Sequence, residues 1–254
     1  MSAALDRFDL TDRVAVVTGG SRGLGAAMCR AFAEQGATVV VASRKEEACV
    51  ALARELGGAS FGLGCHVGRW EDCDRLVDAA YERLGRVDVL VNNAGMSPLY
   101  ESLPAVTEEL FDKVVAVNLR GPFRLASLVG PRMAEGRGGS IINVSSIAAV
   151  QPTAGELPYA TAKAGLNALT VGLSRAFGPS VRVNAIMPGP FLTDISHAWD
   201  LDAFRRVAER TIPLQRGGRP DEVVGAALYL ASDASSYTTG AVIKIDGGAA
   251  YAPS

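Results

Sequence analysis

The stretch Val14-Ala-Val-Val-Thr-Gly-Gly-Ser-Arg-Gly-Leu-Gly25 joins an apolar, β-branched run to glycines at positions 19, 23 and 25. A continuous apolar run is typical of a strand covered on both faces, and a segment of helical period follows at 24–35. Glycine lets a phosphate approach the backbone N–H groups at a helix N-terminus, where the helix dipole favours negative charge. The stretch therefore predicts a strand–turn–helix unit that binds a nucleotide.

The rest of the chain repeats this alternation of strand and helix. Further strand-like runs lie at 37–42, 59–65, 87–91, 140–144, 181–186 and 241–245. Segments of helical period lie between them, at 45–56, 70–84, 107–134, 159–177 and 220–231. The pattern predicts one α/β domain over residues 1–254, a doubly wound, seven-stranded parallel sheet flanked by helices. The weakly patterned segment 190–218 is expected to act as a lid over the substrate.

Composition and charge exclude several classes of protein. The 254 residues carry 25 basic and 27 acidic side chains, so no basic field exists to hold nucleic acid or an anionic membrane. No apolar run of about 18 residues appears, and the N-terminus does not resemble a signal peptide. Two histidines (His66 and His197) and no CxxC pair argue against a metal site. Four scattered cysteines are expected to be reduced thiols in the cytoplasm: Cys29, Cys49, Cys65 and Cys73.

The end of the second strand indicates which dinucleotide is bound. An acidic residue at this point would take the hydroxyls of the adenosine ribose, but the chain reads Ser43-Arg44-Lys45. Arg22, within the glycine turn, can reach the same region. Two guanidinium groups and no carboxylate suit a ribose 2′-phosphate, so we predict NADP(H) rather than NAD(H).

The pair Tyr159 and Lys163 points to catalysis. The spacing of four residues places the phenol and one of only four lysines on the same helix face. A phenol has a pKa near ~10, and a neighbouring ammonium group favours the phenolate. Ser146, at the end of the fifth strand, could hold a substrate oxygen. Together these residues predict hydride transfer between a nicotinamide and a carbonyl or alcohol, with proton exchange at Tyr159.

At this point the chain resembles the compact branch of the short-chain dehydrogenase/reductase family, from about residue 10 to 248. The motifs that carry the resemblance are TGGSRGLG at 18–25, Asn92-Asn-Ala-Gly95, Asn118, Ser145-Ser146, Tyr159-x-x-x-Lys163, Pro188-Gly189 with Thr193, and Asp246-Gly-Gly248. The resemblance implies a Rossmann-type fold with four catalytic residues: Asn118, Ser146, Tyr159 and Lys163. Tyr159 would be the acid/base and Ser146 would orient the carbonyl. Lys163 would bind the nicotinamide ribose, and Asn118 would hold a relay water.

The resemblance also implies a set of cofactor-binding residues along the carboxyl edge of the sheet. They are Gly19, Ser21, Arg22, Gly23, Leu24, Gly25, Ser43, Arg44, His66, Val67, Asn93, Ala94, Gly95, Tyr159, Lys163, Pro188, Gly189 and Thr193. One position departs from the family, which usually has an aspartate after the third strand to bind the adenine amino group. This chain has His66 there, which would either stack on or bond to adenine, or point to solvent.

These features leave several functions open. The leading hypothesis is an NADP(H)-dependent ketone reductase or secondary-alcohol dehydrogenase acting on a small molecule. Within the family, the alternatives are a 3-oxoacyl-carrier-protein reductase and a sugar or polyol dehydrogenase. A different class is a nucleotide-binding regulator without catalysis. Small residues along the 107–134 and 159–177 helices resemble the family's dimer interface, and the 240–251 stretch resembles its second interface, so a homotetramer is expected.

Overall fold

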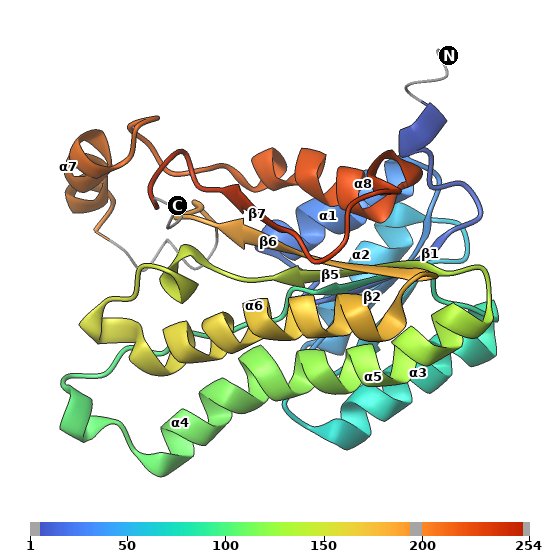
Figure 1. Cartoon of the computed structure of the whole chain (residues 1–254), viewed down its shortest axis with the longest axis horizontal. Helices are drawn as coiled ribbons and strands as arrows, with labels where there is room; N and C mark the ends of the chain where they lie inside the picture. Colours follow the sequence, from blue (N-terminus) through green and yellow to red (C-terminus); the bar gives the residue numbers. More distant parts are fainter. Residues whose placement is uncertain (1–5, 194–199, 251–254) are drawn as a thin grey trace.

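The computed structural model describes residues 6–193 and 200–250 of the chain. Its centre is a parallel sheet with strand order β3-β2-β1-β4-β5-β6-β7, so the expected seven-stranded, Rossmann-like sheet is confirmed (Figure 1). The strands are β1 (Val14–Thr18), β2 (Thr38–Ser43), β3 (Phe61–Gly64), β4 (Val89–Asn92), β5 (Gly139–Val144), β6 (Val181–Pro188) and β7 (Val242–Ile245). The order reverses between β1 and β4, which is where sheets of this kind bind ligands.

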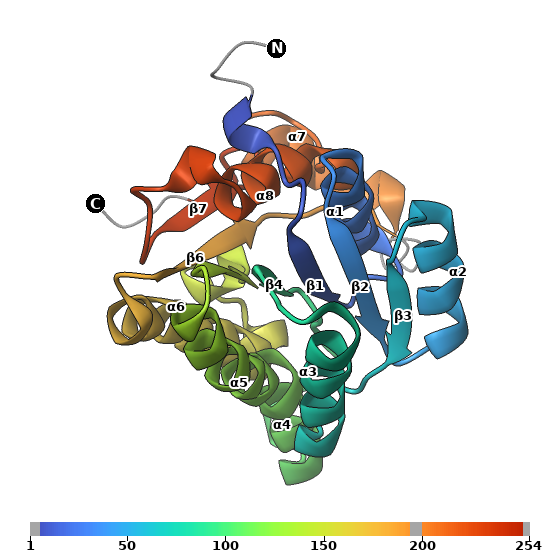
Figure 2. The same cartoon turned by 90° about the vertical axis from the view of Figure 1, so that its right-hand side faces the viewer.

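Helices cover both faces of the sheet (Figure 2). One face carries α1 (Gly23–Glu34), α2 (Glu46–Leu56) and α8 (Val224–Ala231). The other face carries α3 (Trp70–Leu84), α5 (Gly121–Glu135) and α6 (Leu157–Phe177). The remaining helices are α4 (Glu108–Val115), α7 (Leu201–Thr211) and a π-helical turn, η3 (Ala116–Arg120). Short 3-10 turns are η1 (Asp6–Phe8), η2 (Leu103–Ala105), η4 (Ile147–Ala149), η5 (Ala154–Glu156), η7 (Pro220–Val223) and η8 (Asp233–Ser235).

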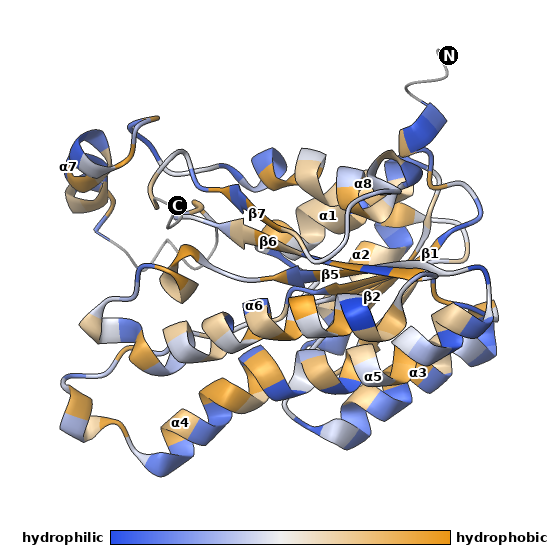
Figure 3. Ribbon diagram, in the orientation of Figure 1, coloured by the Kyte–Doolittle hydropathy of each residue, from blue (hydrophilic) through white to orange (hydrophobic). Residues whose placement is uncertain are grey.

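The sheet separates two apolar cores, which explains the continuous apolar runs. Along β1 every residue is buried, and alternate side chains point to opposite faces. Ala15 and Val17 belong to the core with α1 and α8, whereas Val16 belongs to the core with α3 and α5. Hydrophobic residues accordingly gather on the central strands and on the helix sides that face them (Figure 3). Burying both faces stabilises the sheet by about 1.5–3 kcal/mol per large apolar side chain.

The segment expected as one helix over 107–134 is divided into α4, η3 and α5. Asn118 lies in the π-helical turn, and its amide Nδ2 donates to the Val114 carbonyl at 2.9 Å. Pro122, which has no N–H to donate, follows in the first turn of α5. A buried side chain thus takes over a backbone hydrogen bond, and the helix changes its winding beside the crevice.

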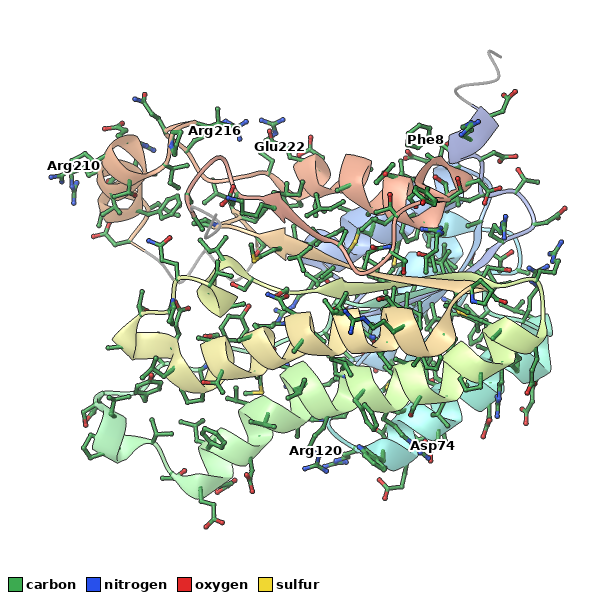
Figure 4. The ribbon with its side chains drawn as sticks, in the orientation of Figure 1. Phe8, Asp74, Arg120, Arg210, Arg216 and Glu222 are labelled. Carbon is green, nitrogen blue, oxygen red and sulfur yellow. The ribbon has the colours of Figure 1, made fainter. Side chains whose placement is uncertain are left out.

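The segment after β6 contains a helix that the sequence analysis does not assign, α7. Asp200 caps it, because its Oδ1 accepts from the Ala203 N–H at 2.9 Å. The two ends of the segment meet where the Leu192 N–H donates to the Gly218 carbonyl at 2.8 Å. Arg216 and Glu222 form a two-pronged ion pair just beyond it, with both N–O distances at 2.6 Å (Figure 4). His197 lies outside the described residues.

Candidate active site

The glycine turn brings backbone close to backbone at the switch point of the sheet. Gly19 and Gly23 have φ angles of +64° and +53°, in the left-handed region that favours glycine. A Cβ on Gly25 would lie 2.3 Å from the Gly19 carbonyl oxygen, so no side chain fits there. The first N–H groups of α1 have no partner inside the helix, and the Arg22 side chain at the N-cap position does not cap them.

Asn93 fastens this turn to the end of β4. Its Nδ2 donates to the Thr18 carbonyl at 2.9 Å and to the Gly19 carbonyl at 3.1 Å. The Thr18 hydroxyl in turn accepts from the N–H groups of Asn93 and Ala94, at 3.1 and 3.2 Å. The amide nitrogen of Asn93, a residue that the resemblance includes in the cofactor-binding set, is thus bonded to the protein. Its role in the structure is to hold the glycine turn in place.

The next strand end, at β2, brings together the residues expected at a 2′-phosphate. The hydroxyls of Ser21 and Ser43 lie 2.9 Å apart, and Ser43 also contacts the Cys49 thiol at 3.0 Å. This chain of hydrogen bonds joins the glycine turn to β2 and α2. Arg22 and Arg44 are exposed, and neither forms a salt bridge within the described part of the chain. Two uncompensated guanidinium groups on the rim suit an anionic ligand.

The end of β3 places His66 beside β2. The Cys65 N–H donates to the Ser43 carbonyl at 2.9 Å, which continues the sheet pairing by one residue. The His66 ring is half-buried, and its Nδ1 accepts from the Gly68 N–H at 3.2 Å. Val67 is buried behind it. One hydrogen bond thus holds the His66 ring against the turn that follows β3.

Lys163 and Tyr159 share one face of α6. Lys163 is only 2% exposed, and its ammonium Nζ donates to the Val144 carbonyl at 2.7 Å. Nζ lies 5.7 Å from the centre of the Tyr159 ring. Burial lowers the pKa of Lys163 to about 7, because the charged form loses its solvation. The spacing of four residues thus creates the contact expected from the sequence.

Tyr159 does not have a lowered pKa in the protein alone. Burial raises its pKa, the Ser146 hydroxyl acts in the opposite direction, and the Glu156 carboxylate raises it further. Desolvation therefore outweighs the Ser146 hydrogen bond, and the lowered pKa that the sequence analysis expects from Lys163 is not present in the protein alone. A protonated Tyr159 is the resting form near neutral pH.

Ser146 and Asn118 complete the group on this side of the crevice. Ser146 follows β5, and its Oγ accepts from the Ala148 N–H at 3.2 Å. Asn118 is fully buried, with Nδ2 bonded to the Met96 carbonyl at 2.8 Å and Oδ1 accepting from the Met96 N–H at 3.2 Å. Gly95 lies between Asn118 and the Lys163 side chain of α6. A Cβ on Gly95 would be 3.0 Å from Asn118 Oδ1 and 3.6 Å from Lys163 Nζ. Four elements distant in sequence thus converge.

The residues after β6 close the crevice over the glycine turn. Gly189 lies against β7, and a Cβ there would be 2.8 Å from Asp246 Cα. Thr193 lies 3.5 Å from the position of a Cβ on Gly23. A cavity of about 550 Å³ opens here, lined by Ser21, Arg22, Gly23, Ala26, Ala27, Arg30, Leu192, Thr193, Leu201 and Pro220. Its volume and its position at a helix N-terminus suit a phosphate-bearing ligand.

Tyr100 is a residue of this site that the sequence analysis misses. Its hydroxyl donates to the Ala154 carbonyl at 2.6 Å and accepts from the Leu157 N–H at 2.9 Å. It thereby ties the loop after β4 to the first residue of α6, next to Tyr159. In the sequence, only its position after the end of a strand indicates that Tyr100 belongs to the site, and it is part of no recognised motif. A narrow cleft beside it is lined by Pro98, Tyr100, Leu110, Val114, Glu156, Pro158 and Tyr159.

Residues 6–193 and 200–250 lack the features of a metal centre and of a membrane span. No cluster of three or more His, Cys, Asp or Glu residues there could hold a metal ion. No helix within these ranges is long and apolar enough to cross a membrane.

Comparison with known proteins adds to this geometry. A family model described as enoyl-(acyl carrier protein) reductase matches residues 19–250. The L-rhamnose 1-dehydrogenase (NAD(P)(+)) of Azotobacter vinelandii is 41% identical over 250 residues, 94% of this chain and 97% of that protein. Dehydrogenase/reductase SDR family member 4 of Bos taurus is 40% identical over 95% of this chain and 88% of its own length. The crystal structure of a gluconate 5-dehydrogenase from Burkholderia cenocepacia, in complex with NADP and tartrate, superimposes with a TM-score of 0.91, with 34% identity and coverage of 97% and 98%.

Proposed function

This chain belongs to the short-chain dehydrogenase/reductase family, and we propose that it interconverts a ketone and a secondary alcohol with NADP(H), using Tyr159 as the acid/base. The observation that carries the proposal is the buried contact of Lys163 Nζ with the Tyr159 ring, 5.7 Å away, beside Ser146 and Asn118. Removing an ammonium group from water is costly. A tyrosine–lysine pair with no role in catalysis would therefore be expected to keep its lysine exposed at the helix surface.

The proton chemistry follows from the hydrogen bonds of these residues. The Ser146 oxygen accepts from the Ala148 N–H, and its own O–H, which contacts the Tyr159 hydroxyl in the protein alone, would turn to donate to a substrate carbonyl oxygen. Tyr159, protonated at neutral pH because burial raises its pKa, gives its proton to the same oxygen during reduction. The cofactor supplies the hydride when it is bound. The phenolate left on Tyr159 is stabilised by the Lys163 ammonium group.

Proton supply to Tyr159 would pass Lys163 and Asn118. Both polar atoms of the Asn118 side chain are bonded to the Met96 and Val114 backbone. A relay water at this residue is therefore held by its main-chain carbonyl, not by its amide. Pro122, four residues after Asn118, has no N–H to donate to that carbonyl, which leaves the carbonyl without the regular helical partner.

The cofactor-binding set fits NADP(H) on structural grounds. Gly25 packs α1 directly against the Gly19 carbonyl, and the unbonded first N–H groups of α1 would then bind a diphosphate. Arg22 and Arg44 lie exposed on the side of β2 and pair with no carboxylate of the described residues. They would hold the 2′-phosphate with charge-assisted hydrogen bonds. The remaining residues of the set would line the base, the riboses and the nicotinamide as the resemblance implies.

We also propose a homotetramer in the cytoplasm, acting on a small molecule. Exposed apolar side chains on three helices, Phe111, Phe123 and Val171, support a helical interface, and β7 leaves an open sheet edge for a second one. The four free cysteines, all buried, suit a reducing compartment. Light scattering should give about four chains, and a clean monomer would contradict this.

The function is tested by cofactor depletion. The chain is mixed with NADPH and a varied carbonyl library that includes sugars, simple ketones and acyl thioesters. We expect NADPH oxidation with at least one ketone, and a loss of about 10³-fold or more in the Tyr159→Phe variant, which keeps the ring but not the proton. Binding of NADPH by the variant should persist. Equal inactivity of both proteins over the whole panel would favour a nucleotide-binding regulator instead.

A further inference from the structure

Glu156 lies beside Tyr159 at the start of α6. It is the residue before the helix, three positions ahead of Tyr159, a spacing that places the two side chains near each other. Both are half-buried, and both line the narrow cleft that Tyr100 also borders. The Glu156 carboxylate raises the pKa of Tyr159, so its charge acts at the phenol to which a substrate would bind.

The fold makes little use of the Glu156 carboxylate. Glu156 is the N-cap residue of α6, but its side chain accepts no N–H of that helix. The Leu157 N–H donates instead to the Tyr100 hydroxyl at 2.9 Å. Within the described residues the carboxylate accepts one hydrogen bond, from the Thr153 hydroxyl to Oε1 at 3.1 Å, and forms no salt bridge. Its negative charge is therefore available to a ligand.

The loops around Tyr159 carry only negative charge. They follow β4, β5 and β6 and comprise residues 96–106, 145–158 and 189–193. In sequence they contain Glu101 and Glu156 but no lysine or arginine. The ammonium group of Lys163 is buried and bonded to the Val144 carbonyl, so it would not pair with a substrate carboxylate. A substrate with a carboxylate or phosphate group would therefore meet repulsion in these loops without a compensating ion pair.

The arginines of α7 do not reverse this balance. Arg205 pairs with Asp202 at 3.4 Å. Arg210 donates from Nε to the Arg206 carbonyl at 3.2 Å, and its side chain points away from the molecule (Figure 4). All three arginines are exposed, so solvent screens their charge. The half-buried Glu156 is screened less, and it lies closer to Tyr159 in the structure.

The same loops also expose apolar surface. Leu99, in the loop after β4, is 94% exposed, and Leu103 in that loop is 51% exposed. Val150, after β5, is 38% exposed. Exposed apolar side chains that gather near a site are suited to contact the hydrocarbon part of a ligand.

We propose that Glu156 determines the substrate class: it favours a small ketone with an apolar body and a positively charged amine, and it disfavours ketones that carry a carboxylate or phosphate. The inference deepens the proposed function and rests on it, because it assumes that a ketone is reduced at Tyr159. Glu156 acts here through its charge on substrate binding, and takes no part in the transfer of the hydride or the proton.

The test compares three cyclic ketones of similar size under saturating NADPH. They are the N,N-dimethyl-4-piperidinone cation, its neutral carbon isostere 4,4-dimethylcyclohexanone, and the anion 4-oxocyclohexane carboxylate. For the native chain we expect kcat/KM to be larger for the cation than for the anion by about tenfold or more. Equal values, or a preference for the anion, would overturn the inference.

Variants of Glu156 separate its charge from the intrinsic reactivity of each ketone, which is the same for every variant. In Glu156→Gln, which keeps an oxygen for the Thr153 hydroxyl, the ratio of kcat/KM for the cation to that for the neutral isostere should fall about tenfold. Glu156→Asp keeps the charge, so its ratio should stay within about threefold of the native one. An unchanged ratio in Glu156→Gln, or an equal fall in both variants, would overturn the inference.

The matched control is Glu34→Gln, which removes one carboxylate far from the crevice. Glu34 is exposed at the end of α1, at the opposite edge of the sheet, so its loss should leave the ratio unchanged. A fall as large as in Glu156→Gln would indicate an effect of net charge and would overturn the inference. If the native chain reduces carbonyls but shows no preference for the cation, the inference alone fails. If it reduces no carbonyl compound at all, the proposed function fails as well.

Discussion

The two sides of the crevice hold their charges in opposite ways. On the catalytic side, Lys163 is 2% exposed and is fixed by one hydrogen bond to the Val144 carbonyl. On the adenosine side, Arg22 and Arg44 are exposed and form no salt bridge within the described residues. Burial changes the pKa of the lysine, whereas solvent screens the arginines. We therefore expect substitution of the buried Lys163 to reduce both catalysis and stability. Substitution of the exposed Arg22 or Arg44 should change the cofactor preference with little effect on stability.

The supporting contacts follow the same division. Tyr159, Ser146 and Asn118 come from three separate segments, with Asn118 fully buried and the other two half-buried. Ser21, Ser43 and Cys49 form a short chain of hydrogen bonds that holds the rim in place beneath the arginines. A change on the catalytic side should thus affect turnover and folding together. A change on the rim should affect ligand preference alone.

We expect the largest loss of turnover from Lys163→Met, which removes the buried charge on the catalytic side. Methionine nearly fills the same space but has no charge, so the Tyr159 phenolate loses its stabilising partner. Turnover of a ketone with NADPH should fall by about 10²–10³-fold, measured under cofactor saturation. A variant that keeps native turnover would contradict the role given to Lys163.

The same variant has a signature in stability. Burial holds the pKa of Lys163 near 7, below its unfolded value, so the unfolded chain binds more protons between that pH and about 10.5. Stability of the native protein should therefore rise as the pH rises through 7. Melting temperatures measured from pH 6.5 to 9 should increase for the native chain and increase less for Lys163→Met. Parallel curves would show that the buried ammonium does not titrate in this range.

The next largest effect is expected on the adenosine side, where Arg44→Asp should change the cofactor preference without affecting stability. A carboxylate would repel a 2′-phosphate and could accept from ribose hydroxyls. The ratio of the NADPH and NADH dissociation constants should move by about ten- to a hundredfold toward NADH, while the melting temperature stays nearly constant. Arg54→Asp, another exposed arginine, on α2, is the control and should leave the ratio unchanged. An equal shift in both variants would point to overall charge instead of a bound phosphate.

Sequence patterns predicted the sheet well because both of its faces are buried. All seven strand-like runs overlap the observed strands, and β1 coincides with its expected range at Val14–Thr18. Motifs with a steric cause were also informative. Backbone contacts within 3 Å require Gly19 and Gly25, a positive φ favours glycine at 23, and the Tyr159–Lys163 spacing follows from the helix period.

What the sequence analysis missed depends on contacts between distant segments. The break between α4 and α5 arises where Asn118 bonds to Met96, 22 residues away, which no local pattern reveals. The bonded amide nitrogen of Asn93 and the raised pKa of Tyr159 likewise follow from packing. Helix α7 is a different case, because Asp200 three residues before the Ala203 N–H is a readable N-cap signal.

The smallest effect is expected from Tyr100→Phe, at the rim of the catalytic side. The variant keeps the ring but loses two hydrogen bonds, to the Ala154 carbonyl and from the Leu157 N–H at the start of α6. Such bonds contribute about 0.5–1.5 kcal/mol each, so the melting temperature should fall by a few degrees. The loop after β4 would then be loosened from α6 on the substrate side, so KM for the carbonyl substrate should rise about two- to fivefold. The dissociation constant of NADPH should stay constant, because the adenosine side is untouched. Tyr237→Phe, a fully exposed tyrosine, is the matched control and should change none of these quantities. If Tyr100→Phe weakened NADPH binding as much as it raised KM, the two sides of the crevice would be coupled through this loop, and their separation would not hold.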